Sequence, residues 1–210
     1  MSGIDKVHFG LEAAVSIPIY HTLALNGAVS WGQYTYDSNP YYLQTQDNSG
    51  DIVSDGYVYW KDFRVESTPQ TAVNVGLSWR SNNNIYLSAD FNYYNNMYLS
   101  MSPIYRTDAV ITGGMAPGDI EHLRRQEKFD SAYTLNASIG KNWYIHRKYT
   151  LGFSLDVKNI LNNQDIKTGG YEQTRLSKNT ETTVTTYQAF DSKYFYMFGT
   201  TYYLNLYFRF

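Results

Sequence analysis

The sequence has no cysteine, five prolines and few charged residues. The absence of cysteine excludes disulfides, thiol catalysis and thiolate metal sites. Charged residues make up 17% of the chain and the net charge is −2, whereas a typical soluble domain is about 25% charged. Binding to nucleic acid needs a concentrated basic patch, and nothing in this charge balance supplies one. We therefore expect no nucleic-acid partner.

The sequence also lacks a long apolar run. No stretch approaches the roughly 18 residues that a membrane helix requires. Residues 1–5 lead directly into an alternating segment, without the basic start and apolar block of a secretory signal peptide. The mean hydropathy of −0.46 still allows the strands of a membrane barrel, because these alternate and average out to polar. An exported barrel needs a signal, so we expect the chain to be either soluble or part of a longer protein.

Tyrosine is abundant, with 22 residues in a chain that is 17% aromatic. Tyrosine favours strands and boundaries between apolar and wet surroundings. The clearest case is residues 196–210, YMFGTTYYLNLYFRF. One parity of this stretch is apolar or aromatic: Tyr202, Leu204, Leu206, Phe208 and Phe210. The other parity holds an amide, hydroxyls and a guanidinium. A period of two predicts a strand with two different faces.

Six earlier segments alternate in the same way: residues 7–17, 22–36, 69–80, 85–94, 133–143 and 151–158. We expect Pro18 to end the first in a tight turn and Pro69 to open the third. Short connections alternate with three long polar stretches, about residues 37–67, 100–128 and 162–193, and the last is long enough to hold its own hairpin. The pattern predicts an all-β fold, an antiparallel up-and-down meander of about seven to eight long strands.

Each predicted strand has one face with no charge in its middle, while the other mixes Gly, Ala, Ser, Asn and a few charges. Buried amides and carboxylates would make a poor soluble core. They suit the wet or plugged lumen of a transmembrane β-barrel, with Trp31, Trp79 and Trp143 near the interfaces. A soluble β-sandwich stays the alternative. The charges expected to point inward are Glu12, Asp90, Asp156, Lys158 and Arg209. They would contact a plug or polar cargo, or simply be solvated in the lumen.

Residues 151–175, LGFSLDVKNILNNQDIKTGGYEQTR, and the aromatic last strand resemble the end of a TonB-dependent outer-membrane transporter. The run VKNILN, residues 157–162, is similar to the penultimate-strand signature of that family. Tyrosine-rich loops and the long meander look most like its SusC/RagA branch. The resemblance covers essentially the whole chain.

The resemblance implies a plugged barrel of roughly 22 strands in the cell outer membrane. It would import scarce solutes, glycan or oligopeptide, with energy from TonB and a SusD-like lipoprotein as lid. No plug and no TonB-box segment are recognisable. The odd strand count and a first strand that starts on the long-loop side also point to strands upstream. We therefore expect residues 1–210 to be the carboxyl-terminal portion of such a barrel, whose last strand resembles the signal read by the barrel assembly machinery.

Aromatic residues in the long polar stretches are the candidate ligand-binding residues: Tyr41, Tyr42, Tyr57, Tyr59, Trp60, Tyr105, Tyr171 and Tyr187. Such rings stack on sugars and hydrogen-bond hydroxyl or peptide groups, or else pack the loops together. A small β-barrel or soluble β-rich module that presents these aromatic loops is the alternative to an importer.

No enzyme, cofactor or metal is expected. The four histidines, His8, His21, His122 and His146, lie on different predicted elements without metal-ligand spacing. Ser, His and Asp are all present, as in outer-membrane phospholipases and proteases. No nucleophile elbow or other local frame positions them as a catalytic triad.

Overall fold

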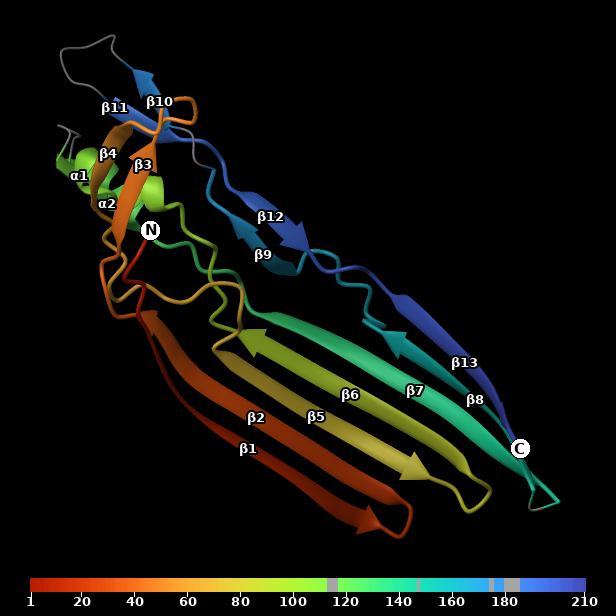
Figure 1. The fold of residues 1–210 in the computed structure, drawn as a ribbon. Coiled ribbons are helices and arrows are strands. Elements are labelled where there is room, and N and C mark those ends of the chain that lie inside the picture. The colour runs from red at the N-terminus through yellow and green to blue at the C-terminus, as the bar shows by residue number, and fades with distance from the viewer. Residues whose placement is uncertain (113–116, 147, 174–175, 180–185) are drawn as a thin grey trace.

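The computed structural model describes residues 1–112, 117–146, 148–173, 176–179 and 186–210. Its largest element is a seven-stranded antiparallel sheet in the order β1-β2-β5-β6-β7-β8-β13 (Figure 1). The strands are β1 (Lys6–Tyr20), β2 (Leu23–Tyr36), β5 (Thr71–Arg80), β6 (Ile85–Asn95), β7 (Ala132–Ile145), β8 (Tyr149–Lys158) and β13 (Thr201–Arg209). Each sheet strand pairs with the next one along the chain, so the predicted all-β antiparallel meander is confirmed.

The prediction that Pro18 ends the first strand was wrong. β1 continues through Pro18, which pairs with Ala24, and ends at Tyr20 after a shift in register. Pro18 has no N–H to donate, and a proline is tolerated in a strand when its N–H side faces away from the partner strand. β1 is an edge strand of this sheet, so one of its sides requires no donor. The short turn lies at residues 21–22 instead.

Strand pairing aligns the alternating side chains of all seven strands. Leu77, for example, is opposite Leu25 on β2 and Ala89 on β6. Large apolar side chains of this face are open: Leu11 is 69% exposed and Leu206 is 71% exposed. Because side chains alternate across a strand, the seven strands together present one continuous apolar face.

The opposite face of the sheet is polar and internally hydrogen-bonded. Ser16 Oγ donates to Asn26 Oδ1 (2.7 Å), and Asn26 Nδ2 donates to Ser78 Oγ (3.2 Å). A hydrogen bond of 2.8 Å also joins the hydroxyls of Ser88 and Ser138. These contacts run from strand to strand, so they satisfy polar side chains without burying them in an apolar core.

Two tyrosines of the polar face lie over glycines. Tyr86 is the cross-strand partner of Gly140, and Tyr207 is that of Gly152. A Cβ at Gly140 would stand 2.1 Å from the end of the Tyr86 ring, and one at Gly152 would stand 2.4 Å from that of Tyr207. A side chain at either position would therefore displace the end of the tyrosine ring.

The three long connections contain elements of their own. The first holds the hairpin of β3 (Tyr41–Thr45) and β4 (Ile52–Tyr57). The second holds η1 (Pro103–Arg106), α1 (Asp108–Thr112) and α2 (Pro117–Arg124). The third holds β9 (Lys167–Tyr171) paired with β12 (Lys193–Tyr196), and β10 (Leu176–Asn179) paired with β11 (Thr186–Ala189). A hairpin was expected only in the third.

These connections gather at one end of the sheet, near the amino terminus, whereas the short turns and the carboxyl terminus lie at the other end (Figure 1). We call the described parts of residues 37–70, 96–131 and 159–200 the loop assembly. No helix among the described residues is long and apolar enough to cross a membrane.

The buried apolar residues lie in the loop assembly and at the adjoining strand ends. One cluster consists of Tyr36, Tyr42, Val58, Trp60 and Met101. A second consists of Met97, Leu99, Phe129, Ala132 and Ile166. The core therefore lies beyond the sheet rather than on it.

Asn159 fixes the point where β8 leaves the sheet. It is 3% exposed and has a positive φ of 52°. Its backbone N–H donates to Asn136 Oδ1 (2.9 Å), and its side-chain amide donates to the carbonyl of Phe198 (3.0 Å). Thr200 Oγ1 donates to the carbonyl of Asn159 (2.8 Å). These bonds join the end of β8 to β7 and to the start of β13.

Candidate functional site

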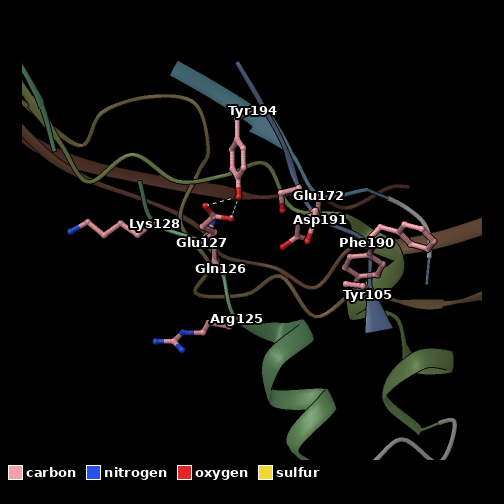
Figure 2. Close-up of a pocket in the computed structure, with 11 residues that line it drawn as sticks. Tyr105, Arg125, Gln126, Glu127, Lys128, Glu172, Phe190, Asp191 and Tyr194 are labelled. Carbon is pink, nitrogen blue, oxygen red and sulfur yellow. Dashed lines mark hydrogen bonds between the residues drawn. The ribbon is translucent and has the colours of Figure 1, made fainter. Parts of the chain in front are cut away.

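A pocket of about 560 Å³ opens between the second and third long connections (Figure 2). Its volume lies in the range of about 300–1,000 Å³ that is usual for ligand sites. Residues 125–128 form one wall and residues 189–192 another. Tyr105, Glu172 and Tyr194 complete the lining. The pocket thus combines aromatic rings with carboxylates.

Two lining residues, Glu127 and Tyr194, hold an ammonium group of the protein, that of Lys167, which itself does not line the pocket. Lys167 Nζ lies 3.2 Å from Glu127 Oε1 and 3.8 Å from the centroid of the Tyr194 ring. The Tyr194 hydroxyl also donates to Glu127, at 2.9 Å from Oε2. Burial acts to lower the pKa of Lys167, but the hydrogen bond and charge of Glu127 outweigh it and raise that pKa. Burial, followed by Glu127, raises the pKa of the Tyr194 phenol.

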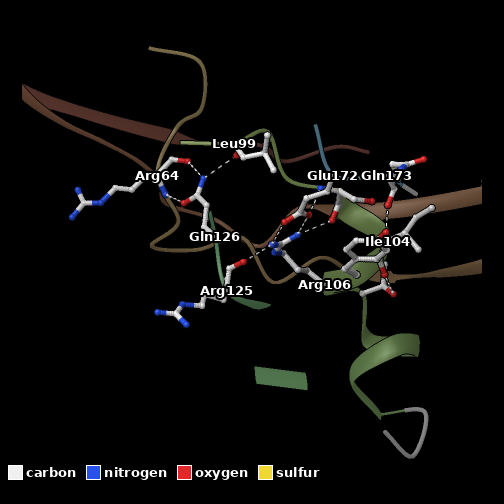
Figure 3. A network of polar contacts seen from close by, with 11 residues as sticks. Arg64, Leu99, Ile104, Arg106, Arg125, Gln126, Glu172 and Gln173 are labelled. Carbon is white, nitrogen blue, oxygen red and sulfur yellow. Dashed lines mark hydrogen bonds and ion pairs between the residues drawn. The ribbon is translucent and has the colours of Figure 1, made fainter. Parts of the chain in front are cut away.

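Behind the pocket, a buried ion pair joins the second connection to the third (Figure 3). The Arg106 guanidinium donates to both oxygens of Glu172, at 2.6 and 2.8 Å. Arg106 is 0% exposed, and the side chain of Glu172 is 12% exposed. The Ser102 backbone N–H also donates to Glu172 (2.7 Å). A charge this deeply buried is tolerated only because it is paired and hydrogen-bonded.

Gln126 links the same segment to the first connection. Its amide accepts from the Arg64 backbone N–H (2.9 Å) and donates to the Arg64 carbonyl (2.7 Å) (Figure 3). The neighbouring Glu127 carbonyl accepts from the Leu99 backbone N–H (2.9 Å). Residues 125–127 therefore contact all three long connections, and their position depends on all of them.

Figure 2 separates the charged side chains of the lining into two groups. The carboxylates of Glu127, Glu172 and Asp191 point toward the cavity, whereas the side chains of Arg125 and Lys128 extend away from it. Asp191 has no ion pair or side-chain hydrogen bond within the described part of the chain. Beside it, the Phe190 ring is 45% exposed. The open wall thus offers a carboxylate that has no ion pair among the described residues and, from the preceding residue, an accessible ring.

The structure places only one of the described candidate aromatics, Tyr105, in this pocket. Tyr105 is 2% exposed, and its hydroxyl donates to the Gln173 carbonyl. Tyr42 and Trp60 belong to a buried cluster, where they pack the loops together. Tyr171 is exposed and lies against Phe195.

Three further candidate aromatics, Tyr41, Tyr57 and Tyr59, lie on or beside the β3–β4 hairpin. Tyr41 and Tyr57 are exposed and meet edge to face, 5.7 Å between ring centroids. Tyr59 donates to Asp108, which also accepts from the Tyr57 backbone N–H (2.8 Å). These two bonds, that of Tyr59 first, lower the pKa of Asp108. Tyr187 lies in β11, and its side chain is outside the described residues.

Strand register puts the five predicted inward charges, Glu12, Asp90, Asp156, Lys158 and Arg209, on the polar face. It puts Tyr202, Leu204, Leu206 and Phe208 on the apolar face, and Phe210 follows the end of β13. The sheet therefore has the two-sided arrangement that the alternation predicted.

The histidines are dispersed. His8 lies against Tyr34 on the polar face, His21 lies beside Tyr20, and His146 is in the turn after β7. The side chain of His122, in α2, is outside the described residues. Over the described ranges, no group of three or more His, Asp or Glu could hold a metal ion.

Sequence reasoning missed most of the pocket. Glu127, Glu172 and Asp191 lie in polar stretches without periodicity, where a carboxylate gives no sign of its partner. Arg106 lies in the same long polar stretch, two residues from Asp108, and gave no signal either. The chain matches no protein-family model, and no curated protein matches it.

Proposed function

We propose that the chain forms the carboxyl-terminal wall and extracellular loops of a transmembrane β-barrel, roughly 22-stranded, in a TonB-energised outer-membrane nutrient importer. The imported solute would be a glycan or oligopeptide. A plug and upstream strands would complete the barrel, and a SusD-like lipoprotein would cover the loops. This proposal rests on the resemblance of residues 151–210 to that family and on the two-faced sheet.

The apolar face of the sheet carries the proposal. Burying apolar surface stabilises a protein by about 25 cal/mol per Å², yet the large apolar side chains of seven adjacent strands are left open. A hydrocarbon solvent would cover this face without a protein partner. It would also favour internally paired backbone groups, which the antiparallel ladder supplies.

The spacing of aromatic residues also fits a bilayer. Trp31 is opposite Thr71 on β5, and Trp79 lies further along that strand. Nine residues, 71–79, separate the two levels. A membrane strand requires about 9–11 residues, and aromatic girdles mark both interfaces of a barrel. Trp143 of β7 also lies on the apolar face, on the short-turn side of the sheet.

Single cysteines on neighbouring residues test the membrane wall, because the natural chain has no cysteine. Leu204→Cys and Asn205→Cys lie on opposite faces of β13. Each variant is reconstituted in phospholipid vesicles and spin-labelled. We expect the label at 204 to collide more with oxygen and the label at 205 more with a water-soluble nickel complex. Equal accessibility at both sites, or a folded chain that stays out of the vesicles, would support the soluble-module alternative.

Uptake tests the importer. Cells that make the chain together with a plug and the upstream strands are given labelled oligosaccharides and oligopeptides. We expect accumulation of one class that stops when the proton-motive force is dissipated. Accumulation that persists without that force would indicate a passive pore instead.

A further inference from the structure

We propose that the pocket between the second and third long connections binds a ligand bearing a primary ammonium group, anchored by the Asp191 carboxylate against the Phe190 ring. The claim that this ligand is imported cargo rests on the proposed function. The claim that the pocket binds an ammonium group does not.

The protein already holds one ammonium group, that of Lys167, at two residues that line the pocket. The Lys167 ammonium is held by one carboxylate, Glu127, and by the face of one ring, Tyr194. The distance of 3.8 Å to the ring centroid is well inside the roughly 6 Å limit for a cation–π contact. The protein thus already uses a carboxylate and an aromatic ring to hold an ammonium group here.

The opposite wall repeats these two chemical groups, and no described cation is paired with them. Asp191 supplies the carboxylate, and the half-exposed Phe190 supplies the ring. Of the three carboxylates that point into the cavity, Glu127 is paired with Lys167 and Glu172 with Arg106. Asp191 is the one with no ion pair among the described residues. An incoming cation would therefore neutralise Asp191 without breaking an internal pair.

Other ligand chemistries fit less well. An anion would face three carboxylates, and the lining cations Arg125 and Lys128 extend away from the cavity (Figure 2). A metal ion is disfavoured because no group of three His, Asp or Glu among the described residues could hold it. An ammonium group needs only one carboxylate, a ring face and room for its own chain, and about 560 Å³ accommodates a small peptide or amine.

Calorimetry with the full chain in detergent micelles tests the proposal. The probes are trilysine, spermidine and glucosamine, which carry the same ammonium group on a peptide, a polyamine and a sugar. Triglutamate and maltotriose are the anionic and neutral controls. We expect at least one ammonium probe to bind, more weakly as salt is raised, and neither control to compete. The probe that binds most tightly identifies the source of the ammonium group.

Three variants locate the site. Asp191→Asn should weaken binding about tenfold, the loss expected for one charge-assisted hydrogen bond. Phe190→Leu should weaken it a few-fold, in line with the roughly 0.5–1 kcal/mol of an exposed cation–π contact. Asp165→Asn removes an exposed carboxylate elsewhere in the same connection and should change nothing. Circular dichroism verifies that all three fold alike.

Unchanged affinity in Asp191→Asn, or tighter binding of triglutamate or maltotriose than of every ammonium probe, would overturn the proposal. Either result leaves the spin-label test of the membrane wall untouched, because binding is measured in micelles without transport. Conversely, a chain that stays out of vesicles yet binds trilysine through Asp191 would contradict the proposed importer and support the proposed ammonium site.

Discussion

The sheet and the loop assembly bury their side chains in opposite ways. In the sheet, large apolar residues such as Phe9, Leu11 and Leu206 are more than half exposed. In the loop assembly, Val58 and Leu99 are almost fully buried, and Arg106 is buried with them. One chain thus contains a region built like the interior of a water-soluble protein and a region that lacks any interior.

The two regions depend on different surroundings. The loop assembly has apolar clusters, a buried ion pair between Arg106 and Glu172, and hydrogen bonds between Gln126 and Arg64, as in the interior of a water-soluble protein. The sheet satisfies its backbone ladder and its polar face but leaves its apolar face to the environment. We therefore expect solvent changes to affect the sheet and changes of internal contacts to affect the loop assembly.

The largest expected effect is on the loop assembly, from Arg106→Met. This change leaves Glu172 mostly buried without its partner, which costs about 3–5 kcal/mol. Hydrogen exchange measured in lipid vesicles should show faster amide exchange in β9 and the second connection, with β5 and β6 unchanged. The double variant Arg106→Met/Glu172→Met should recover most of the protection. Equal loss of protection in the sheet would mean that the two regions are one cooperative unit.

A charge on the apolar face should affect the sheet next most strongly. Val75→Lys lies near the middle of β5 and should destabilise the chain in lipid by about 2–4 kcal/mol, the cost of lysine at a bilayer midplane. Ala28→Lys, on the polar face of β2, is the matched control and should cost far less. Urea unfolding in vesicles measures both. If the two variants behave alike, the apolar face does not contact hydrocarbon.

The strands of the sheet could be predicted from the sequence, whereas the pocket of the loop assembly could not. Alternation alone located all seven sheet strands and both of their faces, because a period of two is a local signal that each strand carries. Pro18 misled, since it lies at a shift in register near the end of β1, where a strand tolerates proline, and local sequence does not show such a shift. The pocket was missed because Glu172 and Arg106 are 66 residues apart. Only tertiary contacts bring such residues together, and no periodicity in the sequence indicates which residues will meet.

The smallest expected effect is a pH dependence confined to the loop assembly. Hydrogen bonds from Tyr59 and the Tyr57 backbone hold the pKa of Asp108 below its ordinary value of 3.8. A carboxyl group whose pKa is lowered by folding stabilises the native state above its ordinary pKa, and that contribution is lost as the pH falls through its folded pKa. Asp108→Asn should therefore lower the stability of the β3–β4 hairpin by a fraction of a kcal/mol, about the value of an exposed ionic contact, at neutral pH.

That deficit should shrink as the pH falls below 3.8, because the wild-type carboxylate then takes up a proton and loses the same advantage. Thermal unfolding followed through a fluorophore on the hairpin, compared between wild type, Asp108→Asn and the control Asp165→Asn, measures it. A deficit that stays constant down to low pH would show that Asp108 acts through its shape rather than its charge. A matching change in β5 and β6 would show that the sheet responds to the titration of the loops, so the two regions would no longer differ in what stabilises them.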